Sequence, residues 1–205
     1  MGYSTEQEEF WAGDFGTEYI ERNKSNLEQA ARIASFSKIL KCTSKINSIV
    51  ELGANIGLNL QAIKLLLPEA KLNAVEINKD AVQHLNRIAD LNVIHESILE
   101  LNTKEKYDLS LIKGVLIHIN PDSLPIAYEK LYQSSNKYIC IAEYFNPSPV
   151  EISYRGHENK LFKRDFAGEI LAAYPDLELI DYGFLYSKDN NFQFDDITWF
   201  LLEKK

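Results

Sequence analysis

The sequence predicts an α/β protein built on a doubly wound, mostly parallel sheet. From residue 46 to residue 144, short apolar runs alternate with helical patterns, as in successive parallel βαβ units. The runs are nearly all apolar, which is expected of strands that are covered on both faces. Two strand-like runs, 177–189 and 195–204, then follow one another with a short link, and such neighbours must pair antiparallel. We therefore expect seven strands, the last one reversed, with helices on both faces of the sheet.

The central part of the chain supplies the first five strands and the helices that connect them. Pro68 closes the first of these helices, because proline cannot continue a helix. After the fifth strand the pattern changes to a long irregular loop at 145–160, and a further helix is expected at 161–176. The five expected strands are 45–53, 71–78, 92–97, 107–115 and 137–144, and the helices between them are 58–68, 79–90 and 121–135.

Two segments precede the sheet. Residues 8–23 are rich in aromatic side chains, and we expect Gly13 and Gly16 to interrupt them. Residues 25–40 begin with Ser25 and Glu28, which have the spacing of a capping box, and are expected to form a helix. We expect one domain over residues 1–205. Its parts are a helical lid at 1–45, a core at 46–144, and a loop, helix and strand pair at 145–205.

Composition limits the class of protein. With 205 residues, 45% of them hydrophobic, the chain suits one globular domain. It has no run of 18 apolar residues, and its first residues are polar and acidic, so we expect neither a membrane span nor export. Cys42 and Cys140 lack metal-ligand spacing, which favours free thiols, a cytoplasmic location and no bound metal. The net charge of −8 disfavours a nucleic-acid partner. The sequence does not decide between a monomer and a dimer.

The loop after the first strand is the expected ligand site, because open parallel sheets bind ligands beyond the carboxyl ends of their strands. Gly53 and Gly57 let a ligand approach the backbone, and Asn55 stands between them. The loop does not match the dinucleotide fingerprint G-x-G-x-x-G, and the carboxylate of Glu51 would repel a pyrophosphate. The stretch therefore favours a ligand with a cationic, phosphate-free head, such as S-adenosylmethionine.

The stretch VELGANIG at 50–57 resembles the first motif of the class I S-adenosylmethionine-dependent methyltransferases, which have a Rossmann-like sheet with a reversed last strand. The resemblance implies S-adenosylmethionine as the cofactor and S-adenosylhomocysteine as the product. It makes Glu76 the ligand of the ribose hydroxyls and places Ser97 and Ile98 at the adenine. The implied cofactor-binding residues are Glu51, Gly53, Asn55, Gly57, Glu76, Ile77, Asn78, Ser97, Ile98, Lys113 and Trp11.

A narrower resemblance spans nearly the whole chain. The segments at 9–23, 50–60, 114–124 and 154–170 together are similar to the pseudaminic acid biosynthesis-associated methylases. This resemblance implies a methylase associated with nonulosonic acid sugars, whose small, anionic acceptor is a sugar or nucleotide-sugar. The aromatic N-terminal segment, with Trp11, would fold over the cofactor as a lid, and a core-packing amphipathic segment is the structural alternative.

The segment 145–164 is rich in basic residues, whereas the chain as a whole is acidic. Arginine matches a carboxylate with its planar fork, so this segment is expected to hold the acceptor. A solvated, charged loop is the structural alternative. The candidate substrate-binding residues are Tyr154, Arg155, Lys163 and Arg164, and the candidate catalytic bases are His118, His157 and Tyr144.

Two other functions stay open at this point. A methyltransferase that acts on a macromolecule, tRNA or protein, would keep the same fold. A non-catalytic homologue would bind the cofactor without using it. For His118, a role inside the core or as a helix cap is the alternative to catalysis.

Overall fold

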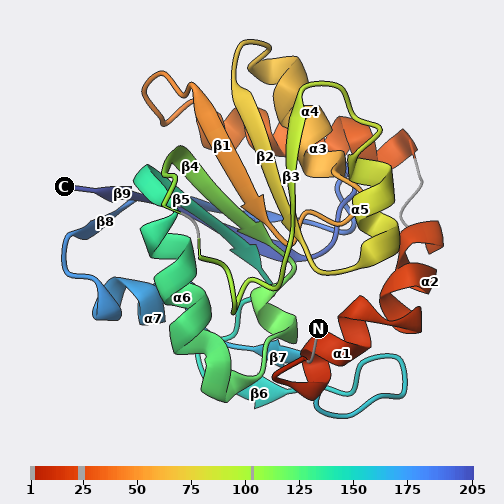
Figure 1. Ribbon diagram of the computed structural model, residues 1–205. Coiled ribbons are helices and arrows are strands. Elements are labelled where there is room, and N and C mark those ends of the chain that lie inside the picture. Colours follow the sequence, from red (N-terminus) through yellow and green to blue (C-terminus); the bar gives the residue numbers. More distant parts are fainter. Residues whose placement is uncertain (1–2, 23–25, 103) are drawn as a thin grey trace.

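The computed structural model describes residues 3–22, 26–102 and 104–205, and its central feature is a seven-stranded sheet (Figure 1). The strands are β1 (Ser48–Leu52), β2 (Lys71–Glu76), β3 (Leu91–His95), β4 (Tyr107–Lys113), β5 (Ser135–Glu143), β8 (Leu177–Leu185) and β9 (Ile197–Lys204). Their order is β3-β2-β1-β4-β5-β9-β8. The strands from β3 to β5 pair parallel, whereas β9 pairs antiparallel with both β5 and β8. The predicted sheet with its reversed last strand is confirmed.

Helices cover both faces of the sheet, because successive side chains of a strand point to opposite faces. In β1, Ile49 packs into the core beneath α3 and α4, while Val50 packs into the core beneath α6 and α7. Both faces are therefore apolar, as the sequence predicts. In the described part of the chain, no helix is long and apolar enough to cross a membrane. The covering helices are α3 (Asn26–Leu40), α4 (Leu58–Leu66), α5 (Lys79–Leu85), α6 (Leu124–Gln133) and α7 (Phe166–Ala173).

The direction of winding reverses between β1 and β4, which lie side by side although β2 and β3 separate them in the sequence. Leu52 pairs with Ile112, so the carboxyl ends of these two strands meet at the same edge of the sheet. A reversal of this kind creates a crevice where open α/β sheets bind ligands. Figure 1 shows the N-terminal helices α1 (Glu6–Ala12) and α2 (Asp14–Arg22) beyond this edge.

The N-terminal helices depend on two glycines in different ways. Gly13 separates α1 from α2, as expected, but the predicted break at Gly16 is wrong, because Gly16 lies inside α2. A Cβ atom at Gly16 would stand 1.9 Å from the carbonyl oxygen of Trp11, so this glycine allows the two helices to pack closely. Thr5 and Glu8 form a capping box at the start of α1. The capping box expected at Ser25 lies outside the described residues.

The segment after β5 is more ordered than a plain loop. Two short strands, β6 (Val150–Glu151) and β7 (Phe162–Lys163), pair antiparallel within it. The helix expected from residue 161 begins only at Phe166, because Asp165 is its N-cap and accepts a hydrogen bond from the backbone N–H of Gly168 at 2.8 Å. Phe162 and Lys163 are therefore strand residues, which corrects the predicted helix start.

Gly16→Ala tests how the N-terminal helices pack. The added methyl group collides with the Trp11 carbonyl, and overpacking of this kind costs about 1–3 kcal/mol. We expect a lower free energy of unfolding in urea and faster hydrogen exchange in α1 and α2. Gly13→Ala is the milder control, since its Cβ would lie 3.0 Å from the nearest atom, the Glu9 carbonyl oxygen. Equal effects of the two substitutions would contradict the packing described.

Candidate functional site

A cavity of about 980 Å³ opens at the crevice beyond β1 and β4. The glycine loop after β1, the ends of β2 and β4, the helices α1 and α2, and the loop between β8 and β9 all contribute to its wall. Of the residues expected at the site, the wall contains Trp11, Gly53, Asn55, Glu76, Ile77, Asn78, Ser97, Ile98, Lys113, His118, Tyr144, Tyr154 and Arg155. The fold thus brings together residues from distant parts of the chain.

The glycine loop has left-handed backbone at three positions. Gly53 has φ 78°, Gly57 has φ 80° and Asn55 has φ 48°. A Cβ at Gly53 would meet Val115 at 2.6 Å, so a glycine is required there for space as well as for conformation. Asparagine tolerates the left-handed region, which explains how Asn55 stands among glycines. Its side-chain Oδ1 accepts a hydrogen bond from the backbone N–H of Ile56 at 2.7 Å and so stays with the loop.

Glu76 joins this loop to the next strand. Its Oε2 accepts a hydrogen bond from the backbone N–H of Asn55, and its Oε1 accepts one from the backbone N–H of Asn78, both at 2.7 Å. Burial raises the pKa of the carboxyl, and the hydrogen bonds from Asn78 and Asn55 oppose the shift. Each oxygen keeps a further lone pair, so the carboxylate can still accept hydrogen bonds from a ligand.

Asn78 links the sheet to the N-terminal helices. Its Oδ1 accepts hydrogen bonds from the first turn of α5, and its Nδ2 donates to the carbonyl oxygen of Trp11 at 3.1 Å. Thr17 donates a hydrogen bond to Asp80 at 3.0 Å, and Ser97 donates one to Glu8. These contacts fix α1 and α2 over the cavity. Asn78, which also lines the cavity, therefore holds the N-terminal helices that are expected to act as a lid.

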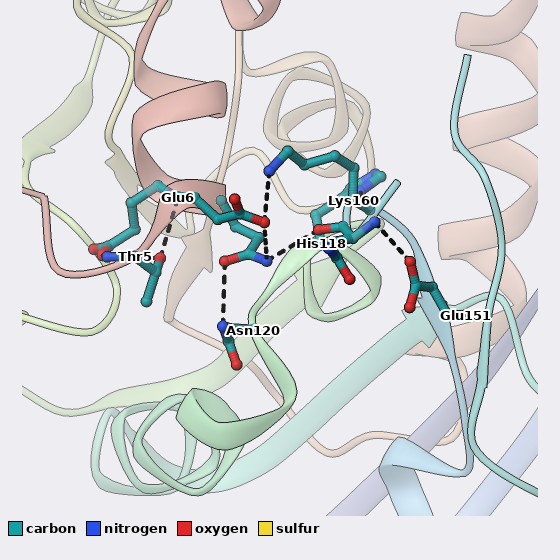
Figure 2. A network of polar contacts seen from close by, with 9 residues as sticks. Thr5, Glu6, His118, Asn120, Glu151 and Lys160 are labelled. Carbon is teal, nitrogen blue, oxygen red and sulfur yellow. Dashed lines mark hydrogen bonds and ion pairs between the residues drawn. The ribbon is translucent and has the colours of Figure 1, made fainter. Parts of the chain in front are cut away.

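A second network fixes the other side of the lid (Figure 2). The Nε2 of Gln7 donates a hydrogen bond to the carbonyl oxygen of Asn159 at 3.0 Å, and Lys160 pairs with Glu6 at 3.0 Å. The backbone carbonyl of Lys160 accepts a hydrogen bond from His118 Nδ1 at 2.5 Å. Helix α1, the segment after β4 and the segment at 150–164 are thereby joined.

Charged side chains lie at the floor of the cavity and behind it: Arg32 and Lys113 line the cavity, whereas Glu51 lies behind the wall. Glu51 is fully buried, and its Oε1 accepts a hydrogen bond from Asn59 at 2.6 Å. Burial raises the pKa of Glu51 to about 7, and burial lowers the pKa of Lys113 to about 8. Arg32, 7% exposed, pairs with Glu28 through one nitrogen. Its Nε and Nη1, together with Glu51 Oε2, are buried without a hydrogen-bond partner among the described residues.

His118 and Trp11 stand together in the wall, with their ring centroids 4.5 Å apart. A carbonyl oxygen only accepts hydrogen bonds, so His118 Nδ1 carries the proton that it donates to Lys160, and Nε2 keeps a lone pair. Burial lowers the pKa of His118 to about 4, so the ring is neutral at pH 7. The indole N–H of Trp11 is buried and has no partner in the part of the chain that the structure describes.

Five expected site residues lie outside the wall of this cavity. Glu51 lies behind Asn59, a wall residue to which it is hydrogen-bonded, and Gly57 is the N-cap of α4. The exposed ring of His157 packs edge-on against Phe10 and Phe15. Lys163 lies in a smaller, adjoining cavity, and Arg164 pairs with Glu169 at 2.6 Å.

The sequence analysis missed several cavity residues. Arg32 and Asn59 line the floor, and the β8–β9 loop adds polar side chains at 187–195. Arg32 interrupts the apolar run AARIA, and Asn59 lies just after the glycine loop. The sequence therefore gives only a weak indication that either residue belongs to the site. Glu143, at the end of β5, was missed too. Its Oε1 accepts hydrogen bonds from the backbone N–H groups of Val115 and Leu116 at 2.9 and 3.0 Å, as Glu76 does for its own loop.

Comparison with known proteins gives structural relatives only. No model of a protein family matches the chain, and no curated protein matches it. Among solved structures, it is similar to the 1,6-didemethyltoxoflavin-N1-methyltransferase of Burkholderia thailandensis with bound S-adenosylhomocysteine. That similarity has a TM-score of 0.75 and 13% identity, and covers 100% of this chain and 92% of the other.

Two further solved structures of methyltransferases are similar to this chain over most of their length. The plantazolicin methyltransferase BpumL, in complex with S-adenosylhomocysteine, has a TM-score of 0.69 and 16% identity over 97% of this chain and 94% of its own. An S-adenosylmethionine-dependent methyltransferase from Clostridium acetobutylicum has a TM-score of 0.65 and 13% identity over 93% of this chain and 97% of its own. The chain has the Rossmann-like fold of class I S-adenosylmethionine-dependent methyltransferases.

His118→Gln tests the burial of the neutral imidazole. Its pKa falls from the ordinary 6.5 to about 4, so between these values the unfolded chain binds a proton that the folded chain does not. Stability is thus lost as pH falls below 6.5. From pH 7.5 to pH 5, the free energy of unfolding in urea should fall by about 2 kcal/mol more in the wild type than in the variant. The raised pKa values of Glu51 and Glu143 make the folded state more stable as pH falls. This contribution is the same in the wild type and the variant, so it cancels when their pH dependences are compared. Identical pH dependence would contradict a buried, neutral His118.

Proposed function

We propose that the protein is an S-adenosylmethionine-dependent methyltransferase that acts on a small molecule. The observation that carries the proposal is Glu76, a buried carboxylate at the end of β2 that holds the glycine loop beside a large cavity. The solved structures with this fold that contain S-adenosylhomocysteine support it. When bound, S-adenosylmethionine supplies a methyl group that an acceptor lone pair takes, while the bonding electrons remain on sulfur.

The residues present fit this cofactor. Glu76 has lone pairs for two vicinal hydroxyls, and the backbone of Gly53 lines the cavity. The unpartnered nitrogens of Arg32 suit the carboxylate of the methionine part, because a guanidinium donates in a planar fork. Glu51 lies behind the floor, and its hydrogen bond with Asn59, a wall residue, places an acidic group near the proposed position of the ammonium group. Ser97 and Ile98 remain the proposed adenine contacts.

The acceptor that we propose is an anionic sugar or nucleotide-sugar related to nonulosonic acid biosynthesis. The sequence resemblance supports this class, and so does the position of Arg155 in the cavity wall. Tyr144 and Tyr154 add ring faces, and His118 is the proposed base, since it is neutral and keeps a free lone pair. Cys42 and Cys140 are free thiols, which supports a cytoplasmic enzyme.

Titration calorimetry with S-adenosylhomocysteine tests the cofactor. The wild type should bind it, and Glu76→Ala should bind at least about tenfold more weakly, because a charged hydrogen-bond acceptor for the ribose is lost. The control is Glu69→Ala, which removes an exposed carboxylate far from the cavity and should bind like the wild type. Failure of the wild type to bind, or undiminished binding by Glu76→Ala, would contradict the proposed function.

Arg155→Ala tests the acceptor. With labelled S-adenosylmethionine and N-acetylneuraminic acid as the probe, KM for the acceptor should rise by roughly fivefold to tenfold, because a cation facing the carboxylate is lost. The affinity for S-adenosylhomocysteine should not change. Arg87→Ala, an exposed arginine outside the cavity, is the matched control. A parallel loss of cofactor affinity in Arg155→Ala would assign Arg155 to the cofactor site instead.

A further inference from the structure

A second cavity of about 370 Å³ adjoins the main one. The two share four wall residues, which are Tyr144, Tyr154, Ser187 and Asp195. A space that opens from the cofactor cavity and has its own wall can hold the part of an acceptor that extends away from the reacting atom. The chemistry of this wall therefore indicates what the acceptor carries.

The wall of the adjoining cavity is apolar on one side and polar on the other. Ile152 and Leu161 contribute aliphatic surface, and the two tyrosines contribute rings. The ammonium of Lys163 lies 4.9 Å from the ring centroid of Tyr144. Such a wall suits a compact ring with polar substituents, because one face of the ring can pack on aromatic side chains while its edge makes hydrogen bonds.

Two neighbouring aspartates have different roles. Asp196 is committed to the fold of the loop, since its carboxylate accepts hydrogen bonds from the backbone N–H of Ser187 at 2.9 Å and from the Ser187 hydroxyl at 3.1 Å. The carboxylate of Asp195 has no hydrogen bond or ion pair with any residue that the structure describes. It lines both cavities, and it is close enough to Lys113 to oppose the lowering of the Lys113 pKa by burial, and close enough to Tyr144 to add to the raising of the Tyr144 pKa by burial.

We propose that the adjoining cavity is the acceptor subsite and that Asp195 selects an acceptor with an O–H or N–H group at the junction of the two cavities. This inference rests on the proposed function. A carboxylate only accepts hydrogen bonds, so it favours a donor group and disfavours a ligand whose anion would face it. Arg155 then binds an anionic group of the acceptor, and Asp195 accepts a hydrogen bond from a donor group of the same acceptor.

Sinefungin provides a test that needs no acceptor. In this analogue of S-adenosylmethionine, a carbon that bears an amine replaces the sulfonium sulfur and its methyl group, so a cationic donor stands at the position of the transferred group. Calorimetry with sinefungin and with S-adenosylhomocysteine gives a ratio of affinities for each protein. We expect Asp195→Asn to lower the preference for sinefungin by about tenfold and to leave S-adenosylhomocysteine binding unchanged.

Asp122→Asn is the matched control, because it changes an exposed carboxylate that lines neither cavity and should leave the ratio as in the wild type. An unchanged ratio in Asp195→Asn would overturn the role of Asp195 while the proposed function stands. A loss of affinity for both ligands in Asp195→Asn would also overturn it, since Asp195 would then support the cofactor site or the loop. If the wild type binds neither ligand, the proposed function and this inference both fail.

Discussion

The carboxylate of Glu76 holds together the parts of the molecule that surround the main cavity. One oxygen binds the backbone of the glycine loop at Asn55, and the other binds the backbone at Asn78. Asn78 in turn caps α5 and binds the carbonyl oxygen of Trp11 in the lid. A loop, a helix start and the N-terminal helices therefore depend on one buried acid, whose ionised form is stabilised by the N–H groups that it holds.

The same arrangement recurs three strands away in the sheet, at β5. Glu143, at the end of β5, holds the backbone after β4 through Val115 and Leu116. Parallel strands end at one edge of the sheet, where the loops that follow them leave backbone N–H groups that need partners. A buried carboxylate satisfies two such groups at once and fixes the loop. The cost is desolvation, which raises the pKa of Glu143 to about 7. Two loops at this edge of the sheet are thus held by buried carboxylates, and residues of α1 and α2 line the cavity beside them.

The sheet and the glycine loop could be predicted because each follows from local patterns, namely apolar runs, helical spacing and glycines after a strand. Further residues such as Glu76 and Ser97 were expected from the resemblance to a family and do line the cavity, but the remaining wall residues could not be predicted, because folding brings them from distant positions. Arg32 lies on a helix before the sheet, and Asp195 lies in the loop before the last strand. Basic side chains look alike in the sequence, yet Arg155 lines the cavity while Arg164 pairs with Glu169. The start of α7 was misjudged because the cap at Asp165 outweighs the helical pattern before it.

The central claim is that the cofactor binds between the glycine loop, Glu76 and the lid. Hydrogen-exchange mass spectrometry with and without S-adenosylhomocysteine tests it most directly, because it reports on backbone amides in each of these parts. We predict that the ligand slows exchange at 53–57, at 76–78 and in α1 and α2, and leaves the outer strand β8 unchanged. Protection confined to other segments, or no protection at all, would contradict the account.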